Sequence, residues 1–156
     1  MKTFRRCSLL LCAFVFLGFG KKEPPLAVTF NVETGAHDSE SFATPVQVSN
    51  PPRTIFVEKM PSITDREIHS VFPFAAADGT LGCAFQLDDH GRMWLDSLSV
   101  EKKGRSLVAF VNGRAVACLL IDKEINDGLI SIPAGLTQQE VAILVKKYPV
   151  MGKKKK

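Results

Sequence analysis

The sequence predicts an α+β fold, a single domain in which helices pack on a mostly antiparallel sheet. Two segments begin with a capping box, Thr64 with Glu67 and Thr137 with Glu140, in which each side chain bonds the backbone N–H of the other and so starts a helix. An Asn-Gly pair at positions 112–113 lies between apolar runs and predicts a β-hairpin, because both turn positions require φ above zero. With 46% apolar residues among 156, the chain can bury one core.

Residues 1–20 have the pattern of a secretory signal peptide. A basic start is followed by an uncharged, mostly apolar run, which is shorter than the ~20 apolar residues of a spanning helix. Gly18 and Gly20 stand at the −3 and −1 positions of a cleavage site before Lys21. We therefore expect cleavage and a periplasmic or extracellular domain; the alternatives are an uncleaved inner-membrane anchor and a cytoplasmic protein. The basic start consists of Lys2, Arg5 and Arg6.

Residues 21–53 are predicted to be an N-terminal strand followed by a polar arm. Residues 26–32 carry the β-branched and aromatic side chains typical of strands. Residues 34–53 hold most of the polar and turn-forming residues, so we expect an irregular loop there. Strand character returns at residues 54–57, where the main domain is expected to begin and continue to residue 149, before a basic tail of residues 150–156.

The capping box at Thr64 predicts a short helix in the main domain. Ile63 and Ile68 flank this box as a hydrophobic staple, and the apolar face that starts at Ile68 ends at Pro73. An alternating strand follows over residues 83–88, with its odd-numbered residues toward the core.

A second helix is predicted from about Arg92 to Gly104, after an acidic turn at residues 88–91. Its core side chains are expected to be Trp94, Leu95 and Leu98.

The Asn-Gly pair predicts a hairpin of residues 106–111 and 115–121. Because residues 115–121 are apolar on both faces, we expect this strand to be central and covered by helices. An Asp-Gly turn precedes a strand at residues 129–132, and the last helix runs from Thr137 to Pro149.

The chemical groups that could form a site are sparse. Asp88, Asp89 and His90 offer metal-binding groups, but an aspartate before a helix more often caps it, and no HxxxH or CxxC pattern supports a metal. The other histidines are His37 and His69, and neither a G-x-S-x-G elbow nor a phosphate-binding glycine loop is present. The sequence therefore predicts no enzyme, and no catalytic, cofactor or metal residues.

The cysteines are compatible with two states, a disulfide or free thiols. Cleavage would remove Cys7 and Cys12, leaving Cys83 and Cys118, which could form a disulfide in an oxidising compartment. Each of these two lies in an apolar strand, where a free cysteine packs as a small apolar residue. We favour buried free thiols.

The net charge of +4 comes from the two ends of the chain. Without the three basic residues of the signal peptide and the lysines at 153–156, the rest has 13 basic against 16 acidic residues. A nucleic-acid-binding surface is therefore not predicted. The Lys153–Lys156 tail is expected to be solvated; its alternative role is weak contact with an anionic membrane.

One block of the chain has a distinctive order and spacing of elements: a strand, an acidic turn with glycine, a helix, a Gly-Arg pair, a hairpin, two strands and a final helix that begins Thr-Gln-Gln-Glu. These segments are residues 85–91, 104–105, 107–114, 121–125, 128–132 and 135–140. In this order and spacing, residues 82–148 resemble the C-terminal part of the first periplasmic head domain of the SecD/SecDF protein-export family, in which the final helix has the pattern T-x-E-A.

The resemblance implies a SecD-head-like fold and the holding of unfolded exported chains. It does not imply the proton-driven motor of that family, whose transmembrane helices have no counterpart in these 156 residues. We therefore expect a non-catalytic exported binding module, accessory to protein export or envelope assembly, with exported polypeptides or an envelope protein as partners. The alternatives are an extracytoplasmic hydrolase assembled from His90, Asp88 and a distant serine, and a structural envelope protein without an export role.

Overall fold

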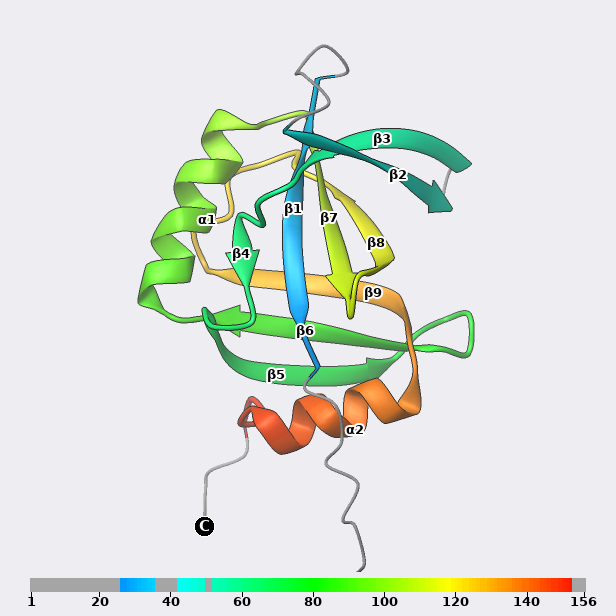
Figure 1. The fold of residues 1–156 in the computed structure, drawn as a ribbon. Coiled ribbons are helices and arrows are strands. Elements are labelled where there is room, and N and C mark those ends of the chain that lie inside the picture. The colour runs from blue at the N-terminus through cyan, green and yellow to red at the C-terminus, as the bar shows by residue number, and fades with distance from the viewer. Residues whose placement is uncertain (1–25, 36–41, 50–51, 153–156) are drawn as a thin grey trace, which may run out of the picture.

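The computed structural model describes residues 26–35, 42–49 and 52–152, which form two antiparallel sheets and two helices (Figure 1). Five strands of the first sheet lie in the order β2-β3-β1-β7-β8, with β4 also paired to β1, and the second sheet has the order β5-β6-β9. The single-domain α+β fold is confirmed, with two sheets in place of one. The bounds are β1 Val28–Thr34, β2 Ala43–Ser49, β3 Pro52–Glu58, β4 Ile63–Thr64, β5 Ile68–Ala75, β6 Leu81–Leu87, α1 Asp89–Glu101, β7 Ser106–Val111, β8 Arg114–Leu120, β9 Leu129–Leu136 and α2 Gln138–Lys147.

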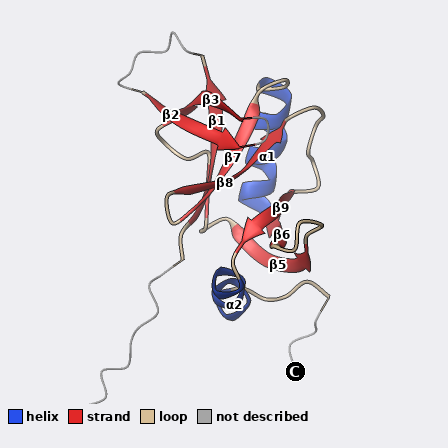
Figure 2. Cartoon of the chain, turned by 90° about the vertical axis from the view of Figure 1, so that its right-hand side faces the viewer, coloured by secondary structure: helices blue, strands red, loops and turns tan. Residues whose placement is uncertain are grey.

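The main core lies between the two sheets. Phe30 of β1 and Phe85 of β6 are fully buried, and their rings meet edge to face with centroids 5.9 Å apart. Burying a side chain of this size stabilises the fold by about 1.5–3 kcal/mol. Figure 2 shows α2 beneath the second sheet, where its buried Leu144 joins the same core.

The hairpin of β7 and β8 forms as predicted. Asn112 and Gly113 make the turn with φ of 49° and 77°, and the two strands pair on either side. The Asn112 side chain also accepts the N–H of Ala27 at 3.0 Å, which fixes the start of β1 beside β7.

Both later helices are confirmed, with one change at the core of the first. The α2 capping box is complete, since Thr137 accepts the N–H of Glu140 and Glu140 accepts that of Thr137. In α1, Leu95 and Leu98 are buried as expected, but Trp94 is 51% exposed. The buried stripe of α1 runs through positions 91, 95, 98 and 99, so residue 94 lies at its margin.

The predicted helix after Thr64 is wrong. Thr64 and Glu67 do bond, with the Thr64 N–H and hydroxyl both donating to Glu67 at 2.8 and 2.6 Å, but the turn leads into strand β5. A helix between Thr64 and Pro73 would have only about two turns and little cooperative stability. Pairing with β6 along the whole of β5 is the more favourable alternative.

The predicted irregular arm is also wrong in its described part. Residues 43–49 and 52–58 form β2 and β3, which pair in continuous register from Ala43 opposite Glu58 to Ser49 opposite Pro52. Val48, Ile55 and Val57 are buried in a second core cluster with Val108 of β7. Polar residues alternate with these apolar ones, so a count of polar residues conceals the strand pattern.

Strand β8 is an edge strand, not the predicted central one. Its two apolar faces arise because it lies between both core clusters: Val116 and Leu119 pack on the main core, whereas Ala115 and Cys118 pack on the β2–β3 cluster. In the described structure its two faces are therefore covered by the main core and by the β2–β3 cluster, in place of the expected helices.

No helix within the described ranges is long and apolar enough to cross a membrane. Three predicted features lie outside the described residues: the signal peptide expected at residues 1–20, His37, and the solvated tail expected at Lys153–Lys156.

Candidate functional site

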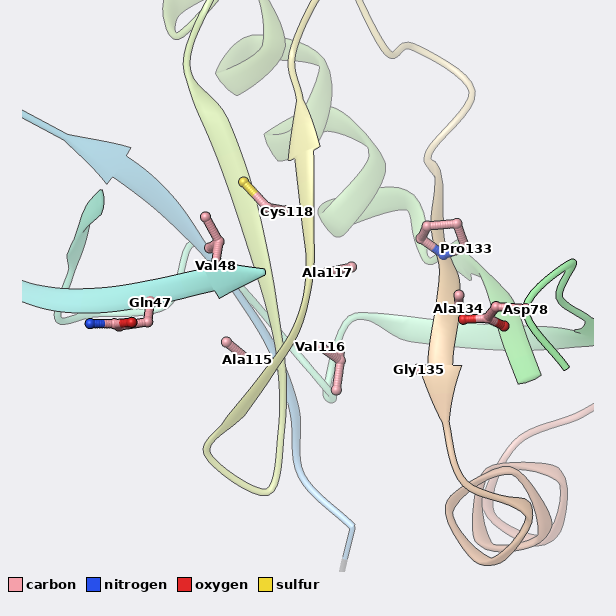
Figure 3. Close-up of a pocket in the computed structure, with 10 residues that line it drawn as sticks. All are labelled: Gln47, Val48, Asp78, Ala115, Val116, Ala117, Cys118, Pro133, Ala134 and Gly135. Atoms are coloured by element: carbon pink, nitrogen blue, oxygen red, sulfur yellow. The ribbon is translucent and has the colours of Figure 1, made fainter. Parts of the chain in front are cut away.

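A groove opens where the edges of β8, β2 and β9 meet (Figure 3). β2 and β8 are the two ends of the first sheet, and they contact each other without pairing among the described residues. β9 ends the second sheet and contacts β8 from the other side. The groove encloses about 310 Å³ and is lined by Gln47, Val48, Asp78, Ala115, Val116, Ala117, Cys118, Pro133, Ala134 and Gly135.

β8 carries main-chain groups that point away from β7, its partner strand among the described residues. The N–H of Ile121 donates to the carbonyl of Arg105 at 2.9 Å, so the main chain of Ile121 faces the β7 side. Because successive residues of an antiparallel pair alternate in direction, Leu120 and Cys118 direct their N–H and C=O groups outward. Within the described part of the chain, no backbone group bonds to them.

The second sheet has one covered edge and one open edge. The segment after α2 covers β5, because the Val71 N–H donates to Pro149 and the Val71 carbonyl accepts from Met151, both at 2.9 Å. The described residues provide no such partner for β9. Pro133 of β9 has no N–H to offer, which suits an edge strand. The open edge of β9 therefore forms the second wall of the groove.

Hydrogen bonds fix the end of this wall. The Gly135 N–H donates to the Thr80 hydroxyl at 2.8 Å, and that hydroxyl donates to Asp78 at 2.6 Å. Arg114 donates to the Gly135 carbonyl at 3.3 Å. Gly135 has φ of 90°, a left-handed conformation that favours glycine, and it lies in ordinary contact distance of the Val116 oxygen on β8.

Two carboxylates near the groove remain ionised at neutral pH. The bond from the Thr80 hydroxyl, followed by that from its N–H, lowers the pKa of Asp78 below its ordinary value. Burial alone would raise the pKa of Glu140, but bonds from Thr137 and Arg114 outweigh it and lower that pKa. Arg114 Nη2 lies 2.9 Å from Glu140 Oε1. Asp78 is the one charged residue among the ten described residues that line the groove.

Both cysteines of the described chain are free thiols, as predicted, but only one is fully buried. Cys83 lies inside the core, and this burial raises its pKa to about 11. Cys118 is half-buried and lines the groove (Figure 3).

The predicted acidic turn serves the helix. Asp88 is the N-cap of α1 and accepts the N–H of Gly91 at 2.8 Å, which confirms the capping interpretation. Asp89 and His90 are exposed on the first turn, and His69 is exposed on β5. No group of three potential metal ligands occurs within residues 26–35, 42–49 and 52–152.

The groove was not predicted from the sequence because most of the residues that line it are small and apolar. A usable signal was present: residues 129–136 form an apolar run that contains both Pro133 and Gly135, which is typical of an edge strand where another backbone approaches closely.

Two solved structures have a similar fold, and both are of SecDF. One, described as a membrane component that enhances protein export, has a TM-score of 0.55 at 14% identity over 83% of this chain and 68% of that chain. The other, SecDF in a super-membrane-facing form, has a TM-score of 0.54 at 16% identity over 80% of this chain and 19% of that chain. No protein-family model and no curated protein matches the sequence.

At these identities the comparison shows the fold alone. The predicted likeness to SecDF is confirmed at that level, and it extends over about four-fifths of the chain instead of residues 82–148. The chain shares its fold with the matched parts of SecDF; assignment to the first head domain in particular stays a prediction.

Proposed function

We propose that this protein is a non-catalytic exported binding module, accessory to protein export or envelope assembly, and that its groove holds extended polypeptide segments. A peptide would add as a strand to the edge of β8, with alternate side chains directed toward β2 and β9. The outward main-chain groups of Cys118 and Leu120 carry this proposal.

The chemistry of the groove supports a polypeptide over a small polar ligand. An exposed strand edge bonds any extended backbone regardless of sequence, which suits a module that receives many clients. The lining of alanines, valines and a glycine leaves room for side chains of differing size. The β8 edge spans seven residues, or roughly 23 Å at about 3.3 Å per residue.

The fold and the N-terminal pattern support the export setting. SecDF, whose fold this chain shares, is described as enhancing protein export. Residues 1–20 would direct the domain to the periplasm or cell exterior, after cleavage or as a retained anchor. Fusion of residues 1–30 to an enzyme active only outside the cytoplasm should give activity; an unprocessed, inactive fusion in the cytoplasmic fraction would exclude export.

Peptide protection of Cys118 from alkylation tests binding at the groove. A soluble peptide of about ten residues with alternating valine and serine should slow alkylation of Cys118, measured by mass spectrometry of the peptide that contains it. The same peptide with every amide N-methylated has no N–H to donate to the ladder and should protect far less. Equal protection by both peptides would contradict strand addition.

Two substitutions at one position provide a matched pair. Leu120→Pro removes one outward N–H, whereas Leu120→Ala keeps it, and both shorten the same exposed side chain. Loss of one hydrogen bond, at about 0.5–1.5 kcal/mol, should weaken peptide binding by roughly 2- to 13-fold in the proline variant relative to the alanine variant. Equal affinities, with both variants folded by circular dichroism, would remove β8 as the binding edge.

A further inference from the structure

We propose that the outer face of α1 is a second binding site, for a polypeptide segment in which basic residues adjoin an apolar run. α1 and the groove strand β8 lie on different sides of β1 and β7 (Figure 1). A shallow depression along α1 has a volume of about 560 Å³. Its lining consists of Met93, Asp96, Ser97, Val100, Glu101 and Glu124.

The apolar side chains of this face are more than half exposed to solvent. Met93 is 65% exposed, Val100 is 61% exposed, and they lie seven residues apart on one stripe of the helix. Trp94, at 51% exposure, flanks the stripe, three residues before Ser97. Met93 can adapt its unbranched side chain to different partners.

The charged part of the face is acidic. Asp96, Glu101 and Glu124 line the depression, and no basic residue is among its described lining. Glu101 is partly neutralised by Lys102 at 3.1 Å. Asp96 and Glu124 have no ion pair with any residue in the described ranges, so two carboxylates remain available to a basic partner.

A side chain of α1 holds the loop that contains Glu124 in place. The Ser99 hydroxyl accepts the N–H of Ile125 at 2.9 Å and donates to the Asp96 carbonyl at 2.8 Å. Ser99 itself is fully buried. This bond ties the loop to α1, so the carboxylates of both elements border one depression.

The acidic charge of this face indicates which class of partner can bind there. An anionic membrane surface or a nucleic acid would be repelled by the acidic rim. A second copy using the same face would place these acids against one another, since a two-fold interface brings identical patches together. A segment with apolar side chains beside lysine or arginine satisfies both parts of the face. Residues 2–17 of this chain exemplify that chemistry, which also characterises export signals in general.

Trp94 reports occupancy directly because it is the single tryptophan of the chain. The probe is a tryptophan-free peptide of about 15 residues, with three lysines followed by a leucine-alanine run. It is added to the protein in the form in which it is purified from cells. We expect a blue shift of Trp94 emission and weaker binding at higher salt. A peptide with glutamates in place of the lysines should bind at least about fivefold more weakly.

Charge-neutralising variants supply the matched comparison. The double variant Asp96→Asn/Glu124→Gln should bind the lysine peptide about 3- to 10-fold more weakly at low salt, and this affinity should depend less on salt concentration. Asp89→Asn with Asp122→Asn removes the same charge outside the depression and should leave affinity within about twofold.

Four outcomes would each overturn the proposal. The first two are equal binding of the lysine and glutamate peptides, and equal effects of the two double variants. The others are tighter binding to anionic vesicles than to the lysine peptide, and self-association that shifts Trp94 emission. Cys118 alkylation is followed in the same samples, so failure at α1 is distinguishable from failure at the groove.

Discussion

Replacing Gly82 by alanine tests the packing that sets the position of the groove wall. Gly82 is buried in β6 opposite Phe74, and an added Cβ would lie 2.4 Å from the Phe74 ring and 2.6 Å from the Pro133 carbonyl oxygen. The ring can rotate away, but the carbonyl belongs to the backbone of β9. Overpacking costs about 1–3 kcal/mol, and alanine in place of glycine in a strand returns about 0.5–1 kcal/mol. We expect a net loss of about 1–2 kcal/mol.

Urea unfolding and thermal melting measure this loss. A decrease of about 1–2 kcal/mol corresponds to a melting temperature lower by roughly 4–8 °C in a domain of this size. Because β9 must move away from Gly82, alkylation of Cys118 should also change in rate. The double variant Gly82→Ala/Phe74→Ala keeps the clash with Pro133, so the altered Cys118 rate should persist. Native stability and an unchanged Cys118 rate in Gly82→Ala would refute the reasoning.

Three further predictions follow from burial and charge. In native protein Cys118 should be alkylated well before Cys83, whose pKa of about 11 and burial keep it unreactive until denaturant is added; equal rates would contradict the assigned burial. Glu140 has a lowered pKa, so its contribution to stability is present above the ordinary 4.5 and is lost as pH falls through the folded-state value; Glu140→Gln should flatten the acid limb of the stability curve, and an unaltered limb would exclude this role. Leu144→Ala should lower the free energy of unfolding by about 2–5 kcal/mol, against less than about 1 kcal/mol for the 40%-exposed Val145→Ala, and similar losses would show that α2 packs differently.

Short sequence motifs correctly predicted the elements that are stabilised by hydrogen bonds within a few residues. The Thr137 capping box and the Asn112 turn satisfy their own backbone groups within a few residues, and both form as predicted. Only half of the Thr64 box forms: Glu67 accepts the Thr64 N–H, but the Thr64 hydroxyl accepts the N–H of Arg66 and not that of Glu67. Strand β5 follows in place of a helix because it pairs with β6, which lies beyond the four residues of the box. The α2 end supports this turn, as Tyr148 donates to the Asp65 carbonyl at 2.8 Å. Such tertiary pairing is not encoded within a short window.

Most of the groove could not be predicted from the sequence, for a related reason; only the β9 edge left a signal, in Pro133 and Gly135. Its lining comes from β2, β8, β9 and the turn before β6, and no part of it has a motif. The two apolar faces of β8 were recognised, but the covering elements are the second sheet and the β2–β3 hairpin, not helices. Which strand ends a sheet depends on pairing across the whole chain, so an open edge is visible only in three dimensions.

Photocrosslinking in living cells tests the central claim, that the groove holds chains in transit. A photoreactive amino acid replaces Ala117 in the groove, and the control replaces Met60, which is 81% exposed outside it. We predict crosslinks from position 117 to newly exported polypeptides, reduced by Leu120→Pro but not by Leu120→Ala, and few from position 60. Equal labelling from both positions, or one unrelated partner from position 117, would contradict the account.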